Sequence, residues 1–332
     1  MTPASPDRIL ELGHAYRACR TLLSAVELGV FTALAEGPLD RDALGRRVGI
    51  HPRGARDFLD ALVALGMLVR SDDGLYANTI EADHYLDRNK PAYVGGLLER
   101  LSMWDYGVWD SLTTALRTGR PQYSKRDDNA LYVGAVSHDL FARGMTVRTR
   151  RVAEALARKF PWGDHDTLID IGTAQGCLPV CIAQAHAHIT GGGFDLPTFA
   201  ATFEGYVEQH GLSSRLRFHP GDFLHAQLPA ADVLVLGRVL HNWDLPTKTM
   251  LLKKAYDALP ADGALIVYER LIDDERRVNT AGLLSSLQML LGNTGGFDFT
   301  GADCVGWMRE VGFHNLRLEP LTAEQSMVVG LK

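Results

Sequence analysis

The chain has 332 residues, of which 46% are hydrophobic and 22% charged, and its formal net charge is −6. This length predicts two domains, or one domain with a large accessory part, and the composition is typical of globular proteins. The acidic balance argues against a general nucleic-acid binder, and no apolar run reaches the roughly 18 residues that span a bilayer. The N-terminus also lacks a signal-peptide pattern, so we expect a cytoplasmic protein that binds neither nucleic acid nor membrane.

The four cysteines form no CxxC pair and have no histidine neighbours at metal-ligand spacing. They are therefore expected to be reduced, mostly buried thiols, and no metal site is expected. The cysteines are Cys19, Cys177, Cys181 and Cys304.

Residues 8–35, 40–49 and 51–66 have helical patterns, and two short apolar runs around Asp72-Asp73-Gly74 predict a hairpin. Three helices followed by a hairpin indicate a winged helix. Residues 1–80 hold nine Arg or Lys and ten Asp or Glu, which is a poor balance for contacting phosphates. We therefore favour a dimerisation domain over residues 1–95 and a homodimer. Residues 96–160 are interpreted as a helical linker that contributes to a substrate pocket, and residues 161–332 as a catalytic domain.

From residue 167 onward, seven short apolar runs alternate with helical segments. This alternation predicts an α/β fold with a parallel sheet covered on both faces. The last two runs lie close together in the sequence, so the final strand is expected to be antiparallel. Ligands of such sheets bind beyond the carboxyl ends of the strands, which directs attention to the residues at those ends.

The first strand ends in Leu-Ile-Asp170-Ile-Gly172, and Gly176 completes a GxxxG spacing rather than GxGxxG. The missing central glycine weakens a dinucleotide interpretation. Asp170 at this turn would repel a diphosphate, whereas it suits a cofactor with a cationic amino group.

Two further strand ends also carry acids. Asp195 follows Gly176 by 19 residues, where a carboxylate can accept hydrogen bonds from ribose hydroxyls. Asp222 and Phe223 follow the third strand, where an acid and an aromatic ring suit an adenine. Three acids in this order predict S-adenosylmethionine as the cofactor.

The fourth strand runs into Arg-Val-Leu-His241-Asn-Trp-Asp. This stretch resembles the HDW-type motif of the plant-type small-molecule O-methyltransferases, which include the caffeate and N-acetylserotonin enzymes and bacterial natural-product tailoring enzymes. The resemblance covers nearly the whole chain and implies a class I methyltransferase domain after a dimerisation domain. It implies that His241 is the general base, that Glu269 at the next strand end is its first supporting acid, and that Asp298, in a segment similar to GGKERT, is the second.

The chemistry agrees with this implication. A phenol has a pKa of about 10 and imidazole one of about 6.5, so neutral histidine can accept the proton during a concerted transfer. An acid on the other ring nitrogen would fix the tautomer. Cofactor-side candidates that complete the set are Leu196, Arg238 and Trp243, and acceptor-side candidates are Trp104, Phe141, Met145, Asn242 and Phe297.

The sequence departs from the family pattern at three places. GTAQG replaces three consecutive glycines, Asn242 replaces an aspartate, and Phe297 and Phe299 replace charged residues beside the second acid. The third departure predicts a more apolar acceptor site and leaves the part of Asp298 in catalysis open.

Three alternatives stay open at this point. The same scaffold could methylate carbon, nitrogen or sulfur, or catalyse a non-methylating reaction. A winged-helix regulator with a ligand-binding domain and a nicotinamide oxidoreductase are the rivals from other classes. The sequence names neither the acceptor nor the position that is methylated.

Overall fold

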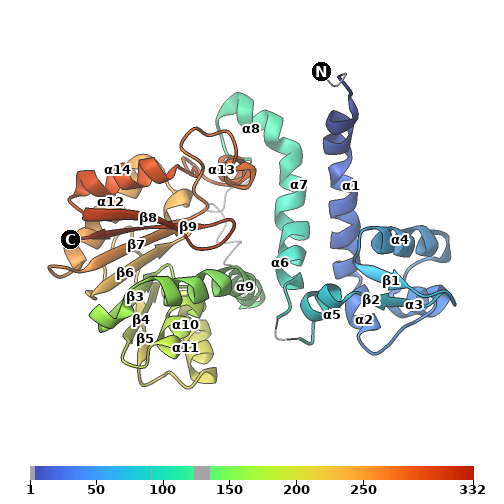
Figure 1. The fold of residues 1–332 in the computed structure, drawn as a ribbon, viewed down its shortest axis with the longest axis horizontal. Helices are drawn as coiled ribbons and strands as arrows, with labels where there is room; N and C mark the ends of the chain where they lie inside the picture. The colour runs from blue at the N-terminus through green and yellow to red at the C-terminus, as the bar shows by residue number, and fades with distance from the viewer. Residues whose placement is uncertain (1–3, 91, 123–134) are drawn as a thin grey trace. The chain divides into compact units, whose positions relative to one another are not determined.

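The computed structural model describes residues 4–90, 92–122 and 135–332, without the side chains of residues 104, 135–144 and 147. The chain divides into two compact units, Met1–Gly107 and Val108–Lys332, and both are drawn in Figure 1. None of the described helices is both long and apolar enough to cross a bilayer.

The first unit contains the predicted helices and hairpin. Asp40 caps its helix as expected, since its side chain accepts a hydrogen bond from the Ala43 amide. The hairpin strands pair in antiparallel register over Leu68–Asn78, and their buried residues join the helices in one core. The elements are α1 (Asp7–Glu27), α2 (Val30–Leu34), α3 (Arg41–Val48), α4 (Pro52–Ala64), β1 (Leu68–Arg70), β2 (Tyr76–Asn78), α5 (Ile80–Leu86), α6 (Gly95–Arg100) and the π-helix η1 (Leu101–Asp105).

One predicted helix is wrong in extent. The segment 8–35 is broken between α1 and α2, because Gly29 adopts a left-handed φ of 72°. Glycine reaches this conformation at little steric cost, so it ends one helix and begins the next.

The second unit contains a seven-stranded sheet with the order β5-β4-β3-β6-β7-β9-β8. The pairs β5-β4, β4-β3, β3-β6 and β6-β7 are parallel, and β9 is antiparallel to both β7 and β8. The predicted α/β fold with an antiparallel last strand is confirmed. The strands are β3 (Thr167–Ile171), β4 (Thr190–Asp195), β5 (Leu216–Pro220), β6 (Val233–Gly237), β7 (Ala264–Glu269), β8 (His314–Pro320) and β9 (Ser326–Leu331).

Helices cover both faces of this sheet (Figure 1). Neighbouring strand residues alternate between two cores: Leu168 packs with the α9, α10 and α11 side, and Ile169 with the α12 and α14 side. The helical elements are α7 (Tyr106–Val108, across the division), η2 (Trp109–Ser111), α8 (Leu112–Thr118), α9 (Ala135–Lys159), η4 (Trp162–Asp164), α10 (Cys177–Ala185), η5 (Pro197–Phe199), α11 (Ala200–Gln209), η6 (Leu240–Asn242), α12 (Leu245–Ala258), α13 (Thr280–Gly292) and α14 (Gly301–Val311).

Candidate active site

The acids at the first two strand ends are buried. Asp170 on β3 is 5% exposed and Asp195 at the end of β4 is 9% exposed. Burial raises the pKa of Asp170 to about 7 and that of Asp195 to about 6. Among the described residues, no lysine or arginine forms an ion pair with Asp170. A buried carboxylate without a cation suits a ligand that brings a positive charge.

The glycine-rich turn after β3 needs its glycines. Gly172 and Gly176 have left-handed φ values of 77° and 88°. An added Cβ would lie 2.9 Å from Val239 Cγ2 at Gly172 and 2.6 Å from the Phe203 ring at Gly176. Asp195 braces this turn, because its carboxylate accepts hydrogen bonds from the amides of Ala174 at 2.8 Å and Leu196 at 2.7 Å. The two acids and the turn therefore form one connected structure.

A pocket opens beside this turn, lined by residues that include Met145, Asp170, Gly172 and Gln175. The Thr146 hydroxyl donates a hydrogen bond to Gln175 Oε1 at 2.9 Å, so α9 is tied to the turn. Thr146 and Gln175 were not predicted, because no spacing in the sequence relates α9 to the turn. Asp170, which has no ion-pair partner among the described residues, and the glycine turn beside it suit the cationic group of the predicted cofactor.

The third strand end differs from the first two. Asp222 is half-exposed, accepts a hydrogen bond from the Leu224 amide and lies 2.7 Å from Nδ1 of His225. The Phe223 ring meets the Trp243 ring edge to face, with centroids 5.8 Å apart. The predicted adenine-side pair of Asp222 and Phe223 thus adjoins the predicted Trp243.

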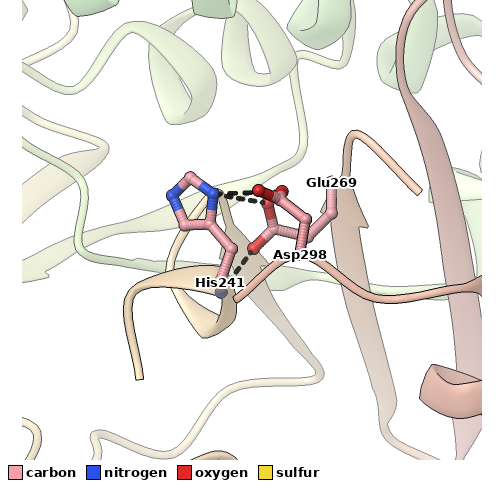
Figure 2. Close-up of side chains that lie close together, drawn as sticks. All are labelled: His241, Glu269 and Asp298. Atoms are coloured by element: carbon pink, nitrogen blue, oxygen red, sulfur yellow. Dashed lines mark hydrogen bonds and ion pairs between the residues drawn. The ribbon is translucent and has the colours of Figure 1, made fainter. Parts of the chain in front are cut away.

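The second part of the site centres on His241, which is 5% exposed in η6. Its Nδ1 lies 3.4 Å from Asp298 Oδ1 and 3.7 Å from Glu269 Oε2, and its backbone amide donates to Glu269 Oε1 at 3.2 Å. Figure 2 shows both carboxylates on the Nδ1 side of the ring, with the other ring nitrogen turned away from them. The hydrogen bond from Nδ1 goes to Asp298, although the sequence ranked Glu269 first.

Arg238 brings a positive charge to the same cluster. Its NH1 lies 3.4 Å from Glu269 and 3.6 Å from Asp298, and its φ of 58° is left-handed. Such a φ is uncommon for a residue with a side chain and occurs often at functional sites. His241, Glu269 and Asp298 also offer atoms within 4.8 Å of one another, as a metal site would, and the Arg238 guanidinium lies against both carboxylates.

The two acids are 1% exposed and differ in acidity. Burial raises the pKa of Glu269 to about 8, a rise that nearby Asp298 enhances and that Arg238 only partly offsets. Burial also acts on Asp298, but the hydrogen bond and the electrostatic interaction with His241, together with Arg238, hold its pKa below the usual value. Two carboxyls with divergent pKa values take different roles, one neutral and one ionised near pH 7.

The other acceptor-side candidates separate into three cases. Asn242 donates hydrogen bonds to the Arg238 and Val239 carbonyls at 3.2 and 3.3 Å and accepts one from Asn293 at 3.4 Å. Phe297 is partly exposed, and its ring packs under the Lys248 ammonium and edge-on to a tryptophan of α14. The side chains of Trp104 and Phe141 lie outside the described residues.

Lys248 is a further residue near the site that the sequence interpretation missed. It is fully buried on α12, and its Nζ donates to the carbonyls of Trp243 at 2.6 Å and Phe297 at 3.1 Å. A signal was present, because Lys248 shares a helical stripe with the buried residues Leu251 and Leu252.

Comparisons with known proteins agree with this architecture. The O-methyltransferase domain model matches residues 109–314, and the O-methyltransferase dimerisation domain model matches residues 10–88. The tetracenomycin polyketide synthesis 8-O-methyl transferase TcmO of Streptomyces glaucescens is 39% identical over 100% of this chain and 99% of its own length. The N,N-dimethyltransferase OxyT of Streptomyces rimosus is 38% identical over 82% of this chain and 81% of its own length.

Solved structures extend the likeness to the complete fold. The crystal structure of human N-acetylserotonin methyltransferase in complex with SAM has a TM-score of 0.91 and 26% identity, and covers 100% of this chain and 99% of the human chain. The predicted class I methyltransferase fold and the predicted cofactor are thereby confirmed.

Proposed function

The chain belongs to the O-methyltransferase family and is an S-adenosylmethionine-dependent O-methyltransferase, and on that premise we propose that it methylates a phenolic hydroxyl of an aromatic polyketide with His241 as the base. The observation that carries the proposal is the buried Nδ1–carboxylate contact of 3.4 Å between His241 and Asp298. The similarity to TcmO, named for polyketide synthesis, supports the acceptor class.

S-adenosylmethionine supplies a methyl group that its sulfonium has already activated. The protein therefore has to orient the acceptor and remove its proton. In the proposed mechanism the N–H group at Nδ1 of His241 donates a hydrogen bond to Asp298. Nε2 then carries no hydrogen and is the nitrogen that accepts the hydroxyl proton. Base catalysis of this kind contributes roughly 100- to 10,000-fold.

The two acids have separate parts in this proposal. Ionised Asp298 fixes the tautomer of His241 and stabilises the imidazolium that forms. Glu269, with its pKa near 8, is mostly protonated at pH 7 and holds the His241 backbone amide and Arg238 in place. Asp298 is therefore the orienting acid, and Glu269 supports the loop.

Cofactor binding is assigned to the strand ends. Asp170 would pair with the cationic amino group, Asp195 would accept the ribose hydroxyls, and Asp222 with Phe223 would hold the adenine. Residues 1–95 would form a homodimer, in line with the dimerisation domain match. The boundaries at 95 and 160 remain proposals.

The test is methyl transfer from labelled S-adenosylmethionine to a panel of hydroxynaphthoic acids and hydroxyanthraquinones. His241→Ala should lower turnover at least about 100-fold, and His314→Ala, which changes an exposed histidine on β8, should leave it unchanged. Unchanged turnover in His241→Ala would remove the base assignment.

Methylation of nitrogen is the second candidate, because OxyT is named an N,N-dimethyltransferase. Aminonaphthoic acids matched to the phenols belong in the same panel. If the label enters the amines and not the phenols, the acceptor is an amino group and the proposed hydroxyl acceptor is wrong.

A further inference from the structure

Lys248 is a buried ammonium group without a direct ion pair among the described residues, although the more distant carboxylates of Glu269, Asp298 and Asp244 raise its pKa. It is 0% exposed, and among the described residues no acid lies within ion-pair distance of its Nζ. Burial is costly for a charged group, and a cation in the first turn of α12 also opposes the helix dipole. Burial lowers the pKa of Lys248 to about 8. A leucine would fit the apolar stripe at lower cost, so the contacts of the ammonium need an explanation.

Those contacts join two loops. One carbonyl that accepts from Nζ belongs to Trp243, two residues after His241, and the other belongs to Phe297, directly before Asp298. Nζ also lies 3.2 Å from the centroid of the Phe297 ring, in a cation–π contact. The ammonium therefore lies between the segment that carries the base and the segment that carries its acid.

The loop of Asp298 is fixed on both sides of one peptide bond. The Phe297 carbonyl accepts a hydrogen bond from Lys248, and the Asp298 amide of the same peptide bond donates one to the Ser286 hydroxyl at 3.2 Å. The loop also approaches the base segment closely, since an added Cβ on Gly296 would lie 2.9 Å from the Asn242 carbonyl oxygen. Little room remains for Asp298 to move while these bonds last.

The family resemblance adds a contrast. In the related segment, charged residues flank the second acid, whereas this chain has Phe297 and Phe299 there. Both rings face Lys248, at 3.2 and 5.4 Å from Nζ to their centroids. In this chain Arg238 lies 3.6 Å from the acid, and Lys248 of α12 adds a second positive charge at a greater distance.

We propose that Lys248 is a positioning residue that ties the Asp298 loop to the His241 segment and so sets the contact between the acid and Nδ1. The inference rests on the proposed roles of His241 and Asp298. Lys248 touches neither reacting atom in this scheme and acts through the loop.

The first test needs no acceptor. Hydrogen exchange is measured by mass spectrometry on peptides that cover residues 293–300, in Lys248→Met and in Lys253→Met. Lys253 lies on the same helix, is exposed and pairs with Asp257, so its variant is the matched control. Lys248→Met should exchange at least about tenfold faster in this segment, with β6 unchanged. An exchange rate within about twofold of the control would overturn the proposed positioning role of Lys248.

The second test separates positioning from general stability. Lys248→Met should lower kcat about 10- to 100-fold, because small displacements of catalytic groups cost this much, while the KM for S-adenosylmethionine stays within about threefold. In an Asp298→Asn background the same change should have little further effect, since the group that it positions is gone. Equal losses in both backgrounds would refute the proposal.

Lys248→Gln keeps a shorter, uncharged hydrogen-bond donor, and it is used in the same tests if Lys248→Met does not fold. If neither variant folds, Lys248 serves the fold as a whole and the proposal is wrong. Normal turnover in Lys248→Met with lost turnover in His241→Ala would refute the Lys248 inference alone. Normal turnover in His241→Ala would instead refute the proposed function.

Discussion

The contact between His241 and Asp298 allows a direct choice between two neighbouring acids. Asp298→Asn would replace an ionised acceptor by an amide that can turn its NH2 toward Nδ1. The imidazole would then carry its hydrogen on Nε2, where it cannot act as a base. A hydrogen bond to a charged group contributes about 1.5–3 kcal/mol, and both partners are buried, so solvent screening is small. At about 1.4 kcal/mol per factor of ten, kcat should fall about 10- to 150-fold.

Glu269→Gln is the matched variant. Because burial raises the pKa of Glu269 to about 8, its carboxyl is mostly neutral at pH 7, and glutamine keeps that neutrality and an acceptor for the His241 amide. The expected loss is less than about tenfold. Both variants are compared at pH 7 under saturating S-adenosylmethionine. A larger loss in Glu269→Gln than in Asp298→Asn would show that the acids have been assigned in the wrong order.

Two further predictions concern ligand binding and pH. Asp170→Asn should weaken S-adenosylhomocysteine binding about 10- to 150-fold in calorimetry, because a charged hydrogen bond to the amino group is lost, while the exposed Asp166→Asn should match wild type. Equal affinities would remove Asp170 from the cofactor site. Burial raises the pKa of Glu269 from 4.5 to about 8, so the folded state binds a proton that the unfolded state has lost. The resulting stability is complete below about pH 4.5 and is lost as the pH rises to about 8. Urea unfolding between pH 5 and 8 should therefore show wild type losing stability relative to Glu269→Gln, and parallel curves would contradict the assigned pKa.

The sheet and its strand-end acids could be predicted because they follow from local patterns. Alternating apolar runs identify parallel strands, and parallel pairing brings their carboxyl ends to one edge. The register of β6 against β7 pairs Gly237 with Tyr268, so Glu269 necessarily ends next to the segment of His241. The family resemblance implied the pair of His241 and Glu269, and the register of the two strands explains why the two residues lie close together.

Asp298 and Lys248 show where local patterns fail. Asp298 lies 57 residues after His241 on a loop, and only the family resemblance pointed to it. Lysine is usually solvated, so the sequence analysis did not single out Lys248, although it occupies a buried stripe. Phe297 was predicted on the acceptor side, and its long-range contact with that lysine could not be read from the sequence. These contacts depend on loops meeting across the fold, which no spacing in the sequence encodes.

The arrangement of Lys248 against Phe297 and Phe299 also constrains how this loop can be exchanged between relatives. Transplanting a segment with charged residues at 297 and 299 would bring a cation against the buried ammonium, or leave the ammonium without its aromatic faces. The helix position and the two loop positions must therefore change together. In a designed chimera, and along any mutational path that connects the two versions, single replacements are expected to pass through an impaired intermediate.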